Sequence, residues 1–122
     1  MTSNGGVNLS EKFALFDEHW SPKIVGRVNT LDVKVVKLLG EFVWHTHEDT
    51  DEVFIVLEGE LTIAFRDEDA SLKTGELLVI PRGVAHRPVA ASQCHVLLVE
   101  PRGVVNTGDA GGPLTPDNDV WI

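Results

Sequence analysis

The sequence predicts an all-β fold, either a closed barrel or a double-sheet jelly roll, with a short helix near its N-terminal end. From Lys23 onward, short runs rich in Val, Ile and Leu alternate with Gly, Pro and Asp, and no second long helical pattern occurs. Turn residues recur about every eight to twelve positions, which is typical of these architectures. Two runs, VFIVL and LLVI, are apolar on both faces, which indicates a sheet that is covered on both sides.

The length of the chain fits one domain. At 122 residues, 43% of them hydrophobic and 24% charged, the chain is expected to fold around one core rather than to stay disordered. Three segments are predicted: a helical segment at 1–22 that packs on the barrel, the β-barrel at 23–102, and an irregular tail at 103–122. The tail is rich in Gly, Pro and Asp, and we expect Trp121 to anchor it.

Charge and hydropathy exclude several classes of partner. A net charge of -9, with basic residues scattered singly, argues against nucleic acid. The apolar runs are too short to cross a membrane, and the first residues lack the basic and apolar parts of a signal peptide, so we expect a cytoplasmic protein. Cys94 is the only cysteine, which leaves no intrachain disulfide and no thiolate metal cage. We expect Cys94 to fill a strand.

The first predicted element is a short helix before Pro22. Phe13, Phe16 and Trp20 fall at helical spacing, and Ser10 is a suitable N-cap. Pro22 would end the helix. We expect this helix to cover one end of the barrel.

The strands follow in order. Their predicted positions are 23–28, 32–39, 42–47, 52–58, 60–66, 76–81, 86–90 and 94–100. In 60–66 the apolar residues alternate with polar ones, which indicates one buried face. Gly59 and the stretch 66–71 supply hairpin turns. Because 53–57 and 77–80 are apolar on both faces and the single helix is too small to cover them, we predict a homodimer.

Two histidines lie close together in the sequence, just before a stretch rich in acidic residues. His45 and His47 are separated by one residue, so on a strand both side chains share a face, about 7 Å apart at a ~3.3 Å rise per residue. Imidazole suits Zn, Cu, Fe and Ni, but two histidines alone are a weak signal. Glu52, which opens the next strand after a turn, and His86, which follows a Pro81–Gly83 turn, would complete a metal site.

Together these residues resemble the two sequence motifs of the cupin superfamily. The first, G-x5-H-x-H-x3,4-E-x6-G, is carried by Gly40, His45, His47, Glu52 and Gly59, and the second, G-x5-P-x-G-x2-H-x3-N, by Gly75, Pro81, Gly83 and His86. The match covers roughly residues 40–90. It departs from the pattern in two places: only four residues separate Gly40 from His45, and Ala90 stands where the family often has Asn. Neither departure touches a ligand position.

The resemblance implies a cupin double-stranded β-helix that holds one divalent metal ion per chain, commonly Fe, Mn, Ni, Zn or Cu. Carried over to this sequence, its ligands are His45, His47, Glu52 and His86. Asp51 is an alternative acidic ligand, because the family accepts three or four intervening residues. We favour Glu52, since it adjoins the strand.

The same resemblance leaves the reaction open, because cupins include dioxygenases, sugar isomerases, decarboxylases and non-catalytic binders. The leading hypothesis is a metal-dependent small-molecule enzyme of the oxygenase or isomerase type, and the alternative is a non-catalytic module that binds or senses a small ligand. An enzyme needs a second titratable group near the metal, and the visible candidates are His95, Cys94 and Arg87. His95 could equally be a paired strand histidine, and Trp44 is expected to point away from the metal.

Overall fold

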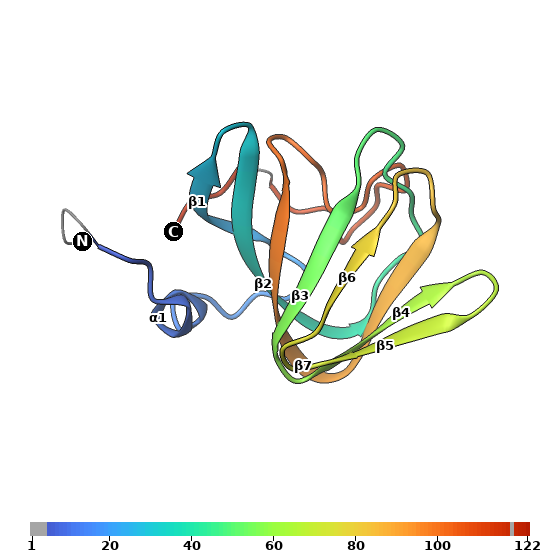
Figure 1. The fold of residues 1–122 in the computed structure, drawn as a ribbon, viewed down its shortest axis with the longest axis horizontal. Coiled ribbons are helices and arrows are strands. Elements are labelled where there is room, and N and C mark those ends of the chain that lie inside the picture. The colour runs from blue at the N-terminus through green and yellow to red at the C-terminus, as the bar shows by residue number, and fades with distance from the viewer. Residues whose placement is uncertain (1–4, 118) are drawn as a thin grey trace.

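The computed structural model describes residues 5–117 and 119–122. The first four residues of the expected helical segment and residue 118 of the expected tail lie outside this description. The elements are α1 Leu9–Phe13, β1 Lys23–Val28, β2 Leu31–Glu41, β3 Glu52–Glu58, β4 Glu60–Phe65, β5 Asp69–Lys73, β6 Leu77–Ile80 and β7 His86–Pro101 (Figure 1). No helix of the described residues is long and apolar enough to cross a membrane.

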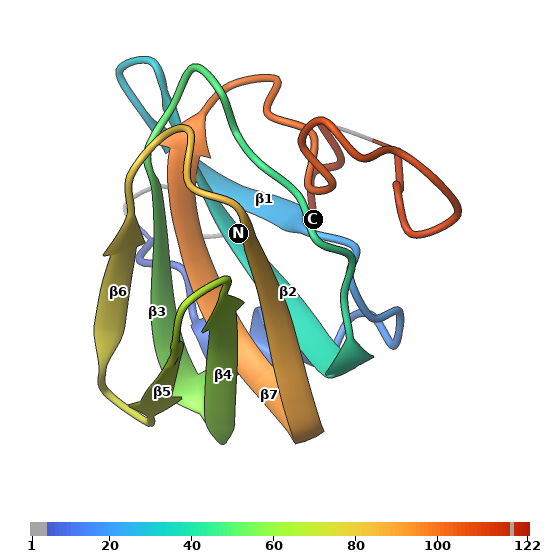
Figure 2. The same cartoon turned by 90° about the vertical axis from the view of Figure 1, so that its right-hand side faces the viewer.

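The strands pair antiparallel around one long strand. The main sheet has the order β1-β2-β7-β3-β6, and β4 pairs with both β5 and β7. The first residues of β7 pair with β4, whereas its second half pairs with β2 on one side and β3 on the other (Figure 2). Because one strand belongs to both layers, the sheet folds over itself. The predicted all-β jelly roll is thereby confirmed.

The interior of the barrel is built from alternating residues. Along β3 and β7 most of the even-numbered side chains are buried and most of the odd-numbered ones are half-buried. The core residues of the barrel include Val36, Leu38, Phe54, Val56, Leu61, Ile63, Ile80, Cys94, Val96 and Leu98. Full burial of one such aliphatic side chain contributes about 1.5–3 kcal/mol, so these rows account for much of the stability.

The N-terminal helix is shorter than predicted and begins elsewhere. Asn8, not Ser10, is the N-cap, and its side chain accepts a hydrogen bond from the Glu11 amide at 3.0 Å. The helix ends at Phe13, well before Pro22. Phe16 is buried all the same, because the Lys37 ammonium group donates to its carbonyl at 2.6 Å and holds the irregular segment against the sheet. Tertiary contact, not helical spacing, buries these aromatic side chains.

Three strand predictions are corrected by the pairing. Residues 42–47 form no strand: His45 alone makes a bridge, with His86, because this segment leaves the sheet to cross the mouth of the barrel. The predicted strands 86–90 and 94–100 are one strand, β7. Part of the stretch predicted as a hairpin turn is β5, which pairs with β4 and buries Leu72 against the core.

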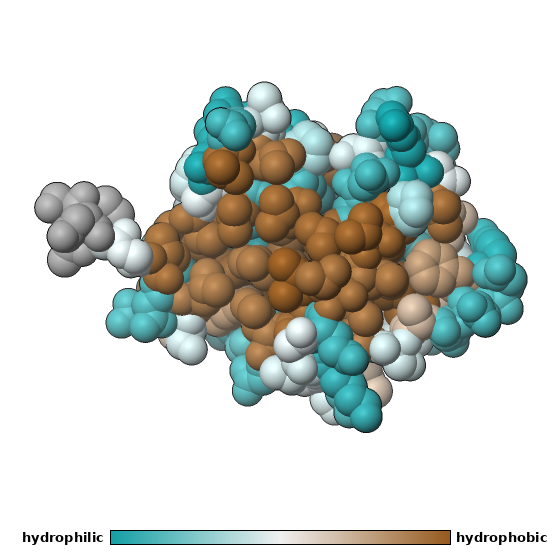
Figure 3. Space-filling model, in the orientation of Figure 1, coloured by the Kyte–Doolittle hydropathy of each residue, from teal (hydrophilic) through white to brown (hydrophobic). Residues whose placement is uncertain are grey.

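One face of the main sheet remains apolar on the outside. The half-buried outward side chains of β3 and β7 are Val53, Ile55, Leu57, Leu97 and Val99. On the edge strand β6, Leu77 and Val79 are 57% and 52% exposed. Figure 3 shows the resulting continuous apolar area across the middle of this face. The N-terminal segment covers one part of this face, where Phe13 and Phe16 form a cluster with Val25 and Val35. Leu57 of β3 and Leu97 of β7 pack against this cluster.

Candidate metal centre

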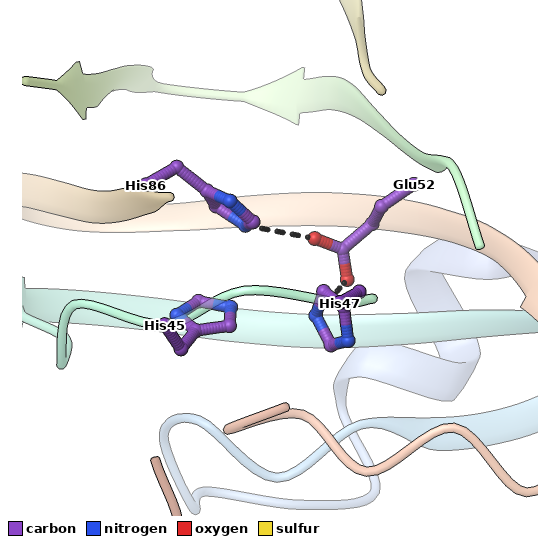
Figure 4. Close-up of side chains that lie close together, drawn as sticks. All are labelled: His45, His47, Glu52 and His86. Carbon is purple, nitrogen blue, oxygen red and sulfur yellow. Dashed lines mark hydrogen bonds and ion pairs between the residues drawn. The ribbon is translucent and has the colours of Figure 1, made fainter. Parts of the chain in front are cut away.

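Four side chains converge at one end of the barrel. His45 and His47 lie on the segment between β2 and β3, Glu52 opens β3 and His86 opens β7, and all four are buried. One ligand atom of each lies within 4.8 Å of every other (Figure 4). Residues from three parts of the chain thus form a single group, and it contains all four predicted ligands.

The carboxylate of Glu52 lies between two of the histidines. Its Oε2 atom is 3.3 Å from Nε2 of His47, and its Oε1 atom is 3.2 Å from Nε2 of His86 (Figure 4). Burial alone would raise the pKa of Glu52, but the two histidines outweigh it and hold this pKa at about 2. The group therefore presents a carboxylate rather than a carboxylic acid. Asp51 lies outside the group, because its carboxylate accepts a hydrogen bond from the Arg82 amide at 2.9 Å.

Backbone carbonyls orient two of the imidazole rings. Nδ1 of His45 lies 2.9 Å from the carbonyl oxygen of Val43, and Nδ1 of His86 lies 2.9 Å from that of Val84. A carbonyl only accepts hydrogen bonds, so each Nδ1 carries a proton and each Nε2 is left for another partner. Metal-binding histidines in proteins are usually held in this way.

A divalent ion fits this group. Nε2 of His47 is buried and lies 3.3 Å from the Glu52 carboxylate, but it forms no well-directed hydrogen bond with any described residue. A buried polar atom without a hydrogen bond costs about 1–3 kcal/mol, which a metal–ligand bond would offset. Ligand atoms around one ion at about 2.0–2.2 Å lie at most roughly 4.4 Å apart, so the group needs only a small contraction. Three imidazoles and a carboxylate suit Fe, Ni, Zn, Cu or Mn.

Comparison with known proteins assigns the family. Residues 35–100, more than half of the chain, match the family model of the cupin domain. The chain is a cupin. The resemblance carried by the two histidine motifs is therefore confirmed, and its departures at the Gly40 turn and at Ala90 do not remove the chain from the family.

Relatives of this cupin include both solved structures and a curated protein. A cupin-2 domain protein from Shewanella frigidimarina is 53% identical, with a TM-score of 0.78 over 79% of this chain and 94% of that one. A solved protein from Neisseria meningitidis is 35% identical, with a TM-score of 0.73 over 80% of this chain and 99% of that one. The uncharacterized protein YdbB of Bacillus subtilis is 50% identical over 64 residues, 52% of this chain, and the match spans only 57% of that protein.

Two hollows adjoin this group of four side chains. A groove of about 400 Å³ lies between the segment 46–50 and the tail residues 102–109, and His47 forms part of its wall. A separate cavity of about 30 Å³ is lined by His45 and Glu52 together with apolar residues such as Phe54 and Leu98. The groove has the size of a small-molecule site.

The C-terminal tail holds the segment that carries the two histidines. The Asp109 carboxylate accepts a hydrogen bond from the Thr46 amide at 2.8 Å, and the Asp109 amide donates to the Thr46 carbonyl at 3.2 Å. Gly108 packs so closely on this carbonyl that a Cβ atom there would overlap with the Thr46 oxygen. The tail is thus a wall of the site, which its irregular sequence did not reveal.

A substitution at Gly108 tests this role of the tail. We expect Gly108→Ala to destabilise the protein by about 1–3 kcal/mol and to weaken metal binding, because both the overlap with Thr46 and the positive φ of 54° disfavour alanine. Gly111→Ala is the matched control: φ there is 63°, but no atom lies within 4 Å of the position that the added methyl group would take. Urea unfolding and metal titration of both variants measure the difference. Equal effects would show that the contact with Thr46 is unimportant.

The three candidates for a second titratable group all lie elsewhere. His95 faces outward, where it stacks on Phe13 and lies 3.1 Å from the Glu58 carboxylate. Cys94 is buried among apolar residues, and this burial raises the pKa of its thiol to about 11. Arg87 lies over the Trp44 ring, away from the four ligands.

Charged residues that sequence reasoning missed line the interior instead. Asp32, Lys34 and Glu100 are only 1%, 3% and 2% exposed. The signal is present in the sequence, because Asp32 and Lys34 have the same parity as Val36 and Leu38 on β2, and Glu100 has the parity of Leu98 on β7. Charged residues near strand ends usually lie on the surface, which hides this signal.

Proposed function

We propose that this cupin binds one divalent metal ion per chain through His45, His47, Glu52 and His86, and that it is a metal-dependent enzyme acting on a small molecule, of the oxygenase or isomerase type. The observation that carries the proposal is the convergence of these four buried side chains beside a groove of about 400 Å³. Four protein ligands leave a position free in the five- or six-coordinate geometry that Fe, Mn and Ni accept. The group contains no cysteine, whereas cysteines complete the four-ligand set of many structural zinc sites.

The protein side of the reaction follows from the walls of the site. When bound, a divalent ion supplies Lewis acidity or, if it is iron, redox chemistry. The groove beside His47 admits a polar molecule, while the apolar cavity beside His45 and Glu52 keeps water away from the part that reaches inward. The carbonyls of Val43 and Val84 fix the direction of two ligand rings, which keeps the group preorganised.

Nitric oxide tests whether the metal has an open position. Protein loaded anaerobically with Fe(II) is expected to form an iron–nitrosyl adduct with a characteristic electron spin resonance signal, because four protein ligands would leave a coordination position free and His47 lines the groove. The same measurement on His95→Ala, a variant outside the site, should give the same signal. Full loading with iron and no adduct would show that the site is closed, and the proposed enzymatic function would then be wrong.

Metal affinity is expected to fall as the pH is lowered. Burial tends to lower the pKa of His47, but the facing Glu52 carboxylate outweighs it and leaves this pKa above the ordinary value of about 6.5. Burial and the neighbouring histidines lower the pKa of His45 to about 4, so His45 stays neutral over most of the range. A proton on His47 must leave before a metal binds, so the logarithm of the affinity should drop by at least about one unit per pH unit below the pKa of His47. Titration calorimetry between pH 8 and pH 5 measures this slope, and a flat profile would contradict the assignment of His47 as a ligand.

A further inference from the structure

The interior wall next to the four ligands carries a buried ion pair. The Lys34 ammonium group donates to Oε1 of Glu100 at 2.9 Å, and both side chains are nearly inaccessible, at 3% and 2% exposure. The other carboxylate oxygen of Glu100, Oε2, is buried and has no hydrogen-bond partner in residues 5–117 and 119–122. Among the described residues, two strong acceptors are therefore left free inside the barrel, this oxygen and Oδ2 of Asp32.

The register of the sheet places Glu100 beside the metal ligand Glu52. Val53 of β3 lies opposite Val99 of β7, so in this antiparallel pair the next positions, Glu52 and Glu100, are neighbours on adjacent strands. Both side chains are buried, so both point into the barrel.

The ion pair of Lys34 and Glu100 is not explained by a gain in the stability of the fold. Burying two charges costs several kcal/mol per ion, and apolar residues of similar size at such positions are often neutral or stabilising. The next inward residues along the same strands, Val36 and Leu98, are apolar and pack well. A free buried oxygen adds a further cost of about 1–3 kcal/mol. A buried ionisable group with these properties next to a metal site indicates a functional role.

A second ion pair lies across the strands from Glu100. Asp32, the cross-strand neighbour of Glu100, is paired with the Arg27 guanidinium group. Arg27 also contacts Asp119 at 3.0 Å, but the Asp119 side chain is 61% exposed, so water screens its charge. Arg27 is itself an exposed residue, so water screens its charge as well. The buried charge next to Glu100 is therefore that of the Asp32 carboxylate.

The sum of the buried charges indicates what kind of ligand would complete the site. With a divalent ion in place, the ion and Lys34 would balance the three buried carboxylates, which are Glu52, Glu100 and Asp32. The ligand therefore need not supply a charge. The free oxygen of Glu100 requires, however, that the ligand bring a hydrogen-bond donor.

We propose that Glu100, positioned by Lys34, is a ligand-binding residue of this site, and that its free Oε2 atom accepts a hydrogen bond from the hydroxyl group of a small hydroxyl-bearing molecule bound at the metal. The inference rests on the proposed metal site and adds the class of molecule that it takes. A charge-assisted hydrogen bond of this kind favours the hydroxyl-bearing molecule over its deoxy analogue by about tenfold or more.

Glycolate and acetate form a matched pair of probes, because they differ by one hydroxyl group. Protein loaded with Co(II) reports binding of either anion through its visible absorption bands. The quantity compared is the ratio of the affinity for glycolate to the affinity for acetate. We expect this ratio to be about tenfold larger for the wild-type protein than for the aqueous Co(II) ion. The double variant Lys34→Met/Glu100→Met replaces both partners by apolar residues of similar shape, so it should fold and bind Co(II) as the wild type does. Its preference for glycolate should fall to that of the aqueous ion.

Two further variants keep the result interpretable. Glu100→Gln retains an oxygen for Lys34 and replaces the charged free acceptor by a neutral amide, so the charge-assisted hydrogen bond is lost and the preference should fall even if the double variant folds poorly. Glu58→Gln removes a carboxylate from the outer face of β3 and should bind both anions as the wild type does. If Co(II) loads but Glu100→Gln keeps the full glycolate preference, or the wild type shows none, the role of Glu100 is wrong while the metal site stands. If the wild type takes up no Co(II), the proposed function fails and this inference with it.

Discussion

His86→Ala is expected to lower the affinity for a divalent metal ion by at least about 100-fold, and His47→Ala should do the same. Loss of groups that merely support a ligand costs about 10–100-fold in affinity, so loss of a ligand itself should cost more. Each histidine supplies one of only four converging atoms, and Glu52 contacts both. Elemental analysis after mild purification and titration with Zn²⁺ or Co²⁺ measure the effect.

His95→Ala is the control for both histidine variants. It removes a histidine from the same strand as His86, but from the outer face, where His95 stacks on Phe13. Its metal content should equal that of the wild type, even where the lost stacking lowers its stability. Unchanged metal content in His86→Ala, or a wild type that takes up no metal on titration, would contradict the assignment of the site.

Val79→Glu is expected to convert the protein from a dimer to a monomer. We propose that this cupin forms a homodimer through the outer face of β3, β6 and β7, because Leu77 and Val79 are more than half exposed next to a continuous apolar area (Figure 3). A second copy suits this face, because contact through apolar side chains buries them while it keeps the negative charges of the two chains, -9 on each, out of the interface. Twofold symmetry would place the new carboxylate in the interface twice.

Light scattering at micromolar concentration measures the change in mass. A buried like-charge pair costs several kcal/mol, so the dissociation constant of the dimer should rise at least about 100-fold. Val105→Glu adds the same charge at a partly exposed valine of the tail and should leave the mass unchanged. A monomeric wild type would contradict the proposal, and so would a Val79→Glu variant that remains dimeric.

The sequence by itself determined the fold class and the four candidate ligands. Alternation in strands such as β4, with turns between them, depends on neighbours two residues apart, so it is visible directly in the sequence. The ligands were found for a different reason, because their spacing matches a family motif. The strand expected at residues 42–47 does not form, yet His45 and His47 still reach the same group. The prediction of the site therefore did not depend on the local structure assumed for it.

Only the tertiary structure decided which other residues belong to the site. Glu100 stands 48 positions from Glu52, and their proximity follows from the register between β3 and β7, which no local pattern specifies. The tail likewise reaches Thr46 through the Asp109 contacts, which depend on how the chain returns over the barrel mouth. Short-range periodicity tells which residues share a face, but long-range pairing decides which face is interior and what lies across from it. That is why the four converging side chains could be predicted from this sequence, whereas the ion pair of Lys34 and Glu100 could not.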